Sequence, residues 1–259
     1  MELKKSEFKV IWANRYLMIK GKNYDADFHS HHAIQISIAL EDCISLETEN
    51  EKFTGEIIVV NHQIKHALKM NQGSLLILLE PDSIEGQALK HWLGNEQVKT
   101  LDSTRELKPC LRGFDDLKKE MKSEIDHMFS SMVNHITEKN IVTLPIDERV
   151  RTCLEHIEAN LHTNDFSLKH LAEVVYLSES RLQHLFKEQV GVPLTSYIQW
   201  FKVLKAVKYT LVGGMSMTDA AQEGDFADSS HFSRAFRGMF GKSLSGYLKD
   251  SRMVQVIFI

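Results

Sequence analysis

Residues 178–197 read SESRLQHLFKEQVGVPLTSY, and residues 228–247, fifty positions later, read DSSHFSRAFRGMFGKSLSGY. Each segment places two large apolar residues four apart, then a cation, then a glycine four residues after the cation. Apolar residues at this spacing share one face of a helix, and the glycine can end that helix in the left-handed conformation. Ser178 and Asp228 are suitable N-caps at the two starting points. The pattern predicts the same helix twice.

A short amphipathic segment precedes each of these helices, from Leu168 to Val175 and from Met217 to Glu223. Helix, tight turn and helix, repeated, is the outline of two helix-turn-helix units in series. The second helix of such a unit has the right size to enter the major groove of DNA. A helix from Pro193 to Leu211, with Trp200 in its buried stripe, is predicted to join the units. It would hold the two second helices one turn of DNA apart, roughly 34 Å.

The region from about Pro145 to Asp250 resembles the DNA-binding domain of the AraC/XylS transcription regulators. In the second unit the resemblance lies in residues 229–237, with the sequence SSHFSRAFR, and in Phe240, Gly241 and Tyr247. In the first unit it lies in Leu171, Ala172, Ser178, Leu182, Phe186, Lys187, Gly191, Tyr197, Ile198 and Ala206. These matches extend over many spaced positions, so they are far more specific than a single short motif.

Three residues depart from the family pattern. Asp225 stands where the family usually has Gly, Leu244 where it has Pro, and Lys202 where it has Arg. Asp tolerates a positive φ better than most residues, so the turn at Asp225 is still expected to form. Lys202 keeps the charge of Arg but lacks its bidentate fork.

The resemblance implies that the polar faces of the two recognition helices contact double-stranded DNA. The DNA-contacting residues expected in the first helix are Ser180, Arg181, Gln183, His184 and Lys187, and those in the second are Ser229, Ser230, His231, Arg234 and Arg237. Gln183 can pair bidentately with adenine and Arg234 with guanine, although Arg234 can equally grip phosphate. Lys187 and Arg237 lie a turn further on and favour phosphate contacts. The alternative interpretation is a solvated polar face without a partner.

Charge alone does not predict DNA binding here. The chain carries a formal net charge of −4, and residues 145–259 contain seven Lys and six Arg against six Asp and seven Glu. A DNA-binding domain is usually basic. The positive footprint is therefore expected to be local, with the acids elsewhere, and to consist of Arg181, Lys187, Lys202, Lys205, Lys208, Arg234 and Arg237. A neutral domain also predicts binding that depends strongly on salt and on a second subunit.

The first 80 or so residues read as short strands. Apolar and β-branched runs occur at Ile34–Leu40, Cys43–Leu46, Glu56–Val60 and Ser74–Leu79, separated by turn residues. Several short strands at this spacing suggest a small antiparallel barrel or sandwich. The predicted fold is therefore an α+β multidomain chain: an N-terminal antiparallel β domain, a helical linker and an all-α C-terminal domain.

The strand region also resembles the cupin-like arm found ahead of this DNA-binding domain in many relatives, through the stretches 28–32 and 61–66. Such arms often sense a small molecule, and the effector pocket expected here comprises His29, His31, His32, Gln35 and His66. Imidazoles can also bind divalent metals. An enzyme-type cupin would add a Glu after the paired histidines, where this chain offers Gln35 and Ile36. We therefore favour a metal-free pocket or structural histidines over a metal site.

Helical character is predicted, with breaks, from Ser83 to Asn140. An apolar stripe runs along it through Leu107, Leu111, Phe114, Leu117 and Met121. The stripe could dock on the chain's own strand domain or pair with its copy in a second subunit. Because helices in this region often form the dimer in the family, dimerisation is slightly favoured.

The 259 residues suffice for two domains with real cores. The expected division is a cupin-like effector domain at 1–82, a helical linker and dimerisation segment at 83–144, the DNA-binding domain at 145–250 and a short apolar tail at 251–259. The tail is expected to pack on the protein or fray. Three scattered cysteines, no apolar leader after Met1 and no long apolar run indicate a cytoplasmic protein with no membrane segment.

The combined prediction is a sequence-specific transcriptional regulator, active as a homodimer on promoter DNA together with RNA polymerase and modulated by a small-molecule effector. No phosphate loop, nucleophile elbow or paired carboxylates indicate catalysis, so neither catalytic residues nor a cofactor are expected. The alternative is a cupin-type metal-binding enzyme or sensor with the helical domain as a scaffold. A third reading keeps DNA binding without any ligand.

Overall fold

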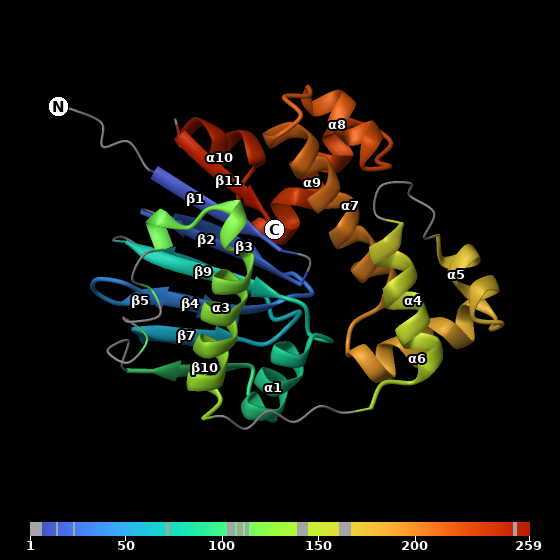
Figure 1. Cartoon of the computed structure of the whole chain (residues 1–259), viewed down its shortest axis with the longest axis horizontal. Coiled ribbons are helices and arrows are strands. Elements are labelled where there is room, and N and C mark those ends of the chain that lie inside the picture. Colours follow the sequence, from blue (N-terminus) through green and yellow to red (C-terminus); the bar gives the residue numbers. More distant parts are fainter. Residues whose placement is uncertain are drawn as a thin grey trace. The chain divides into compact units, whose positions relative to one another are not determined.

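The computed structural model describes residues 7–13, 15–22, 24–70, 73–102, 107, 111, 114–138, 145–160, 167–250 and 253–259. Its internal contacts divide the chain into two compact units (Figure 1). Unit 1 consists of residues 1–143 together with 240–259, and unit 2 consists of residues 144–239. Unit 1 is built around strands and unit 2 from helices. The predicted architecture of a β domain followed by a helical domain is confirmed.

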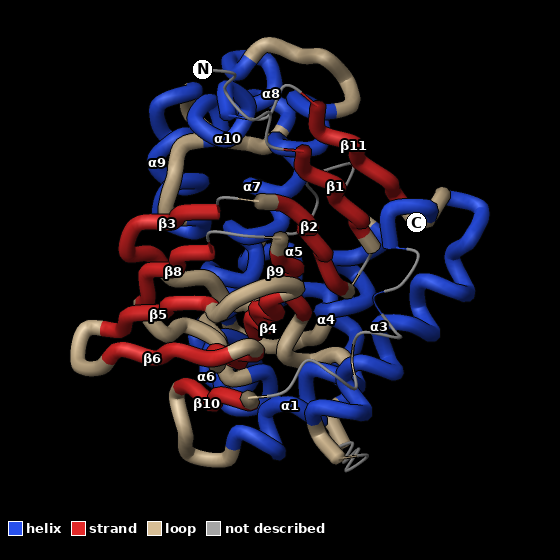
Figure 2. Tube along the Cα trace, turned by 90° about the vertical axis from the view of Figure 1, so that its left-hand side faces the viewer, coloured by secondary structure: helices blue, strands red, loops and turns tan. Residues whose placement is uncertain are grey.

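Two sheets form the frame of unit 1 (Figure 2). The strands are β1 (Glu7–Trp12), β2 (Tyr16–Gly21), β3 (Tyr24–His29), β4 (Ile34–Ala39), β5 (Ile44–Thr48), β6 (Lys52–Gly55), β7 (Ile57–Val60), β8 (His66–Met70), β9 (Ser74–Leu79), β10 (Val98–Leu101) and β11 (Met253–Phe258). One sheet has the order β10-β7-β4-β9-β2-β1-β11 and the other β3-β8-β5-β6. Neighbouring strands are antiparallel apart from β1 and β11, which run parallel.

The larger sheet is covered on both faces, which is why every residue of β4 is buried. Ile36 and Ile38 point to one face and join a core with the helices α1 (Ile84–Leu93) and α3 (Lys122–Ile136). Successive side chains of a strand point to opposite faces, so Gln35 and Ser37 point toward the smaller sheet. The polar side chains of β4 therefore lie between the two sheets.

The segment predicted to be a helical linker contributes more to unit 1 than expected. It contains β10, which pairs with β7 at the edge of the larger sheet. Four residues are too few for their alternation to distinguish a strand from a loop, so the sequence did not predict it.

The described members of the apolar stripe lie in the chain's own core, where Leu107, Phe114 and Leu117 are buried. The stripe therefore docks on its own sheet, and it includes the 3-10 turns η1 (Phe114–Asp116) and η2 (Lys119–Met121). Residues 108–110 and 112–113 of the stripe lie outside the described residues.

The C-terminal segment, expected to pack on the protein or fray, is the strand β11. It pairs in parallel with β1, with Glu7 opposite Met253 and Trp12 opposite Phe258. Ile257 is buried in the core of unit 1. Its partner strand is almost the whole chain away, so local sequence does not reveal the pairing.

The helices of the C-terminal half follow the predicted stripes. They are α4 (Glu148–Ala159), α5 (Leu168–Val174), α6 (Glu179–Val190), α7 (Leu194–Leu211), α8 (Met217–Glu223), α9 (Ser229–Phe240) and α10 (Leu244–Asp250). Trp200, in the predicted stripe of the joining helix α7, is 2% exposed. Within the described ranges, none of the helices combines the length and the apolar character that a membrane crossing needs.

Candidate nucleic-acid interface and buried histidine cluster

The first repeated unit is α5, a tight turn and α6. Tyr176 turns the chain with φ +55°, and the Leu177 amide then donates to the Ala172 carbonyl at 2.9 Å. Ser178 caps α6, because its hydroxyl accepts a hydrogen bond from the Arg181 amide at 3.3 Å. Gly191 ends the helix with φ +94°. The predicted cap and glycine stop are confirmed.

The second unit, α8 to α9, has the same design. Asp225 turns the chain with φ +59°, the Phe226 amide donates to the Ala221 carbonyl at 2.9 Å, and Gly241 has φ +72°. The Asp228 carboxylate accepts from the His231 amide at 2.6 Å and caps α9. The prediction that Asp225 accepts the positive φ of the family's glycine is confirmed.

The fifty-position offset predicted for the recognition helices is confirmed, but the helices that precede them repeat at a different offset. The first helices begin at Leu168 and Met217, 49 positions apart, whereas the recognition helices begin at Glu179 and Ser229, 50 positions apart. The turn of the second unit is therefore one residue longer. The extra residue lies between Phe226 and Asp228, so it is Ala227.

Each recognition helix has an apolar face turned inward and a polar face turned outward. Leu182, Phe186, Phe232 and Phe236 are buried. Among the ten predicted DNA contacts, Ser229 is half-buried, and the exposed ones are Ser180, Arg181, Gln183, His184, Lys187, Ser230, His231, Arg234 and Arg237. The rings of His231 and Phe226 pack in a T-shaped contact, with their centroids 5.2 Å apart. The sequence therefore identified an accessible polar face on each helix.

Two departures from the family pattern meet in the structure. The Lys202 ammonium, on α7, lies 2.5 Å from the carboxylate of Asp225 in the second turn. Lys205, one turn further along α7, is only 8% exposed. The nearby charges of Glu223 and Asp225 favour its protonated form. The expectation that acids lie away from the positive footprint is wrong for Lys202 and Lys205, because the turn brings an acid to the side of α7 that carries them.

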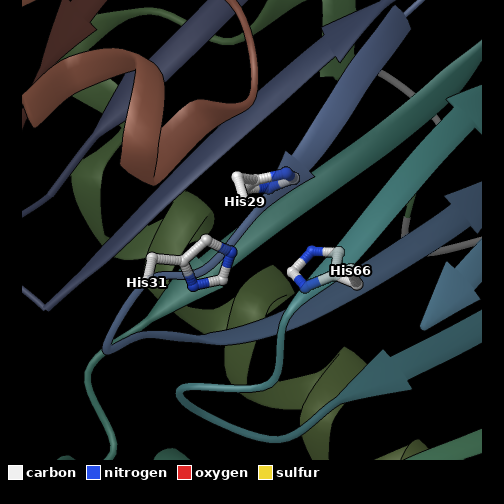
Figure 3. Close-up of side chains that lie close together, drawn as sticks. All are labelled: His29, His31 and His66. Carbon is white, nitrogen blue, oxygen red and sulfur yellow. The ribbon is translucent and has the colours of Figure 1, made fainter. Parts of the chain in front are cut away.

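Three histidines converge inside unit 1 (Figure 3). His29 ends β3, His66 begins β8 opposite it, and His31 lies in the loop between β3 and β4. Each ring can place one nitrogen within 4.8 Å of the others. The side-chain oxygen of Gln35 lies 3.1 Å from Nε2 of both His31 and His66. We refer to His29, His31 and His66 as the histidine cluster.

Main-chain carbonyls hold the three rings. Nδ1 of His29 lies 2.8 Å from the Asp27 carbonyl, Nδ1 of His31 2.9 Å from that of Ala33, and Nδ1 of His66 2.8 Å from that of Ile64. Burial lowers the pKa of all three imidazoles, that of His66 to about 3, despite opposing hydrogen bonds. The rings are therefore neutral near neutral pH.

His32, predicted to share this pocket, does not join the cluster. Its Nε2 pairs with the Glu80 carboxylate at 2.5 Å, and both side chains are buried. Consecutive histidines therefore have different side-chain partners, Gln35 for His31 and Glu80 for His32. The adjacency of His31 and His32 in the sequence does not reveal this difference.

The turn after α9 rests on the strand that carries His29. The Asp27 amide donates to the Gly241 carbonyl at 3.1 Å. A Cβ atom at Gly241 would lie 2.4 Å from the Asp27 carbonyl oxygen and 2.8 Å from Nδ1 of His29. Gly241 is therefore required both by its backbone conformation and by this close approach.

Comparison with known proteins agrees with this geometry, since the helix-turn-helix domain family matches residues 171–250. The arabinose operon regulatory protein of Escherichia coli is 31% identical over 103 residues, which is 40% of this chain and 35% of that protein. The transcriptional activator NphR of a Rhodococcus species is 27% identical over 128 residues, 49% of this chain and 38% of that protein. The chain thus spans little more than a third of the length of these relatives.

Beyond the helix-turn-helix domain, the comparison with solved structures concerns the fold of the whole chain. ToxT from Vibrio cholerae O395 matches with a TM-score of 0.59 at 14% identity, covering 92% of this chain and 98% of that one. ToxT bound to an unsaturated fatty acid matches with a TM-score of 0.54 at 15% identity over 98% and 99% of the two chains. The chain therefore shares with ToxT a fold in which a strand-rich part is followed by a helical part. The resemblance to the AraC/XylS regulators, predicted from the sequence, is confirmed for the C-terminal region.

Proposed function

We propose that this protein is a sequence-specific DNA-binding transcriptional regulator of the AraC/XylS type. The recognition helices α6 and α9 would enter successive major grooves. The observation that carries the proposal is the repeated division of these helices into a buried apolar face and an exposed polar face. Two similarly capped turns that each present a polar helix face are expected of a protein that reads DNA with both helices. A polar face that contacts only solvent does not require them.

The contacts expected on DNA follow from the side chains on the exposed faces. Gln183 and Arg234 carry groups that can read adenine and guanine edges in the major groove. Lys187 and Arg237 stand one turn further on and would bind phosphate, which fixes position without reading sequence. The regulators among the similar proteins support this assignment.

Unit 1 would carry the regulatory input. Its fold is shared with ToxT, one structure of which contains an unsaturated fatty acid. For this chain we propose that the effector acts at the histidine cluster, because the cluster adjoins the turn that follows α9. The same proposal includes a cytoplasmic homodimer that acts with RNA polymerase at a promoter. Because the apolar stripe around Phe114 is buried in the core of unit 1, we do not propose it as the dimer surface.

The test is selection of bound sequences from a random duplex pool with the full chain, at low and at moderate salt. We expect an enriched motif of two blocks whose centres lie about one helical turn apart, roughly 34 Å. A chain with Gln183→Ala and Arg234→Ala should lose the enrichment, whereas Glu188→Ala, at an exposed position of α6 outside the expected contacts, should keep it. Absence of any enriched motif at both salt concentrations would refute the regulator. Light scattering of the chain bound to that motif would test the homodimer.

A further inference from the structure

We propose that the histidine cluster is a binding site for one divalent transition-metal ion, held by His29, His31 and His66 with the side-chain oxygen of Gln35 as a fourth ligand. The identity of this ion as the effector rests on the proposed regulatory function. The binding itself does not.

For two of the rings the proton position follows from their partners. A carbonyl only accepts hydrogen bonds, so Nδ1 of His31, facing Ala33, and Nδ1 of His66, facing Ile64, must carry the proton. In a neutral imidazole the other nitrogen, Nε2, then has a lone pair. Both Nε2 atoms point at the Gln35 oxygen, which is also an acceptor. With the Gln35 amide in this orientation, three acceptor atoms converge.

A metal ion satisfies this set directly. Imidazole nitrogens and an amide oxygen are ligands for first-row divalent metals. Metal-bound histidines usually donate their second N–H to a carbonyl, which fixes the tautomer, and His31 and His66 have such a carbonyl in place. Nδ1 of His29 likewise faces the Asp27 carbonyl. The supporting interactions of a metal site are therefore present around all three rings.

The Gln35 amide gives the site a second state. With its oxygen toward the rings, its nitrogen donates to the Ser37 hydroxyl at 3.1 Å. If the amide turns over, its two N–H groups can donate to His31 and His66, and the Ser37 hydroxyl can donate to its oxygen. The metal-free chain can thus satisfy the same groups by rotating one amide. A cation would select the orientation with oxygen inward.

The geometry requires only small movements. Zn–N bonds of about 2.0–2.1 Å place tetrahedral ligand atoms roughly 3.4 Å apart, whereas the three nitrogens here lie within 4.8 Å. The rings must therefore close in by roughly 1 Å. His29 and His31 keep 4% and 5% of their surface exposed, so the cluster is not sealed from solvent.

Movement of the rings on metal binding would displace the turn after α9. His29 is the ring whose Nδ1 lies against Gly241, and the Gly241 carbonyl accepts from the Asp27 amide. A movement of the His29 ring would therefore reach the end of the second recognition helix through one strand. This supplies a route by which the metal ion could alter DNA binding.

The first experiment is titration of the metal-free full chain with Co²⁺, followed by the visible absorption of tetrahedral Co²⁺. We expect one ion per chain, displaced by Zn²⁺, which binds more tightly than Co²⁺ at such sites. His31→Gln and His66→Gln should each weaken binding at least tenfold. His62→Gln, in the turn that leads into β8 but outside the cluster, should leave binding unchanged. Gln35→Glu should tighten binding because a carboxylate replaces the amide oxygen. A wild-type chain without the absorption, or variants that bind as well as wild type, would overturn the site.

A measurement on the unaltered chain covers the case in which the variants fail to fold. X-ray absorption of the Zn²⁺-loaded protein should find three imidazoles at about 2.0–2.1 Å from the ion. One imidazole or none would refute the cluster as the site.

The effector role has its own readout. With the motif from the selection experiment, Zn²⁺ should change the affinity of the full chain for DNA by between about 5- and 150-fold. An unchanged affinity would overturn the effector role alone. Selected DNA without metal binding would refute this inference and leave the regulator standing. Metal binding without any selected DNA would support the metal site and refute the regulator.

Discussion

Arg234 and Lys187 are both exposed cations on recognition helices, yet they should affect DNA binding differently. Arg234 can pair bidentately with a guanine edge, so Arg234→Ala should lower affinity for the selected motif by about 1–3 kcal/mol and leave other sequences little affected. Lys187→Ala should weaken all sequences alike and flatten the salt dependence by about one unit. Binding isotherms across salt for motif and scrambled duplexes measure both. An equal loss on every duplex for Arg234→Ala would show a phosphate contact instead.

Gly241 and Gly238 offer a matched pair of glycines. At Gly241 the positive φ alone costs a side chain roughly 1–2 kcal/mol, and a Cβ would also collide with the Asp27 carbonyl. Gly238 lies inside α9 with nothing within 4 Å of a Cβ, so alanine there should stabilise by roughly 0.5–1 kcal/mol. Denaturant unfolding of both variants measures the difference. Similar stability for the two alanine variants would contradict the close approach of Gly241 to β3.

Single residues were predicted well where their chemistry is local. The caps Ser178 and Asp228 and the glycine stops follow from neighbours within four positions. The contact of Gly241 with His29 could not be predicted, because the two residues are more than 200 positions apart. It also depends on the backbone conformation of Gly241. The spacing of His29 and His31 did suggest convergence. The carbonyls that orient the rings depend on loop geometry, which the sequence does not encode in any recognisable pattern.

At the scale of elements, the turn between α8 and α9 carries an acid that holds a cation of α7. Asp225→Asn keeps a residue that tolerates the positive φ but removes the charge that pairs with Lys202. The freed ammonium can then reach phosphate. We expect stronger binding to all DNA sequences and a steeper salt dependence, by up to about one unit. In a Lys202→Ala background the same substitution should leave the salt slope unchanged. A slope that steepens equally in both backgrounds would mean that Lys202 is not the cation released.

Elements with strong periodicity were predictable, and short or non-local ones were not. The strands β4 and β9 stand out as buried β-branched and leucine runs, and α7 follows from its apolar stripe. The single extra residue in the second turn lies before the repeated segment, so the repeat itself does not reveal it. The edge strand β10 is four residues long, and its pairing with β7 is set by tertiary structure.

On the scale of the whole molecule, the pairing of β1 with β11 makes the two ends of the described chain part of one core. Ile11 and Ile257 are register partners, and both belong to the core of unit 1. Ile11→Ala and Ile257→Ala should each destabilise unit 1 by about 2–5 kcal/mol. Their double variant should deviate from additivity by at least about 0.5 kcal/mol. The check is a double-mutant cycle in denaturant, and strictly additive losses would argue against the pairing.

The order of the units along the chain has a mechanical consequence. Unit 2 is an insertion: the chain leaves unit 1 once, builds residues 144–239, and returns to the same body at 240. A domain joined to its neighbour by two segments has fewer accessible orientations than a domain joined by one. Such a restraint removes orientational freedom before any partner arrives, so less entropy remains to be lost on docking.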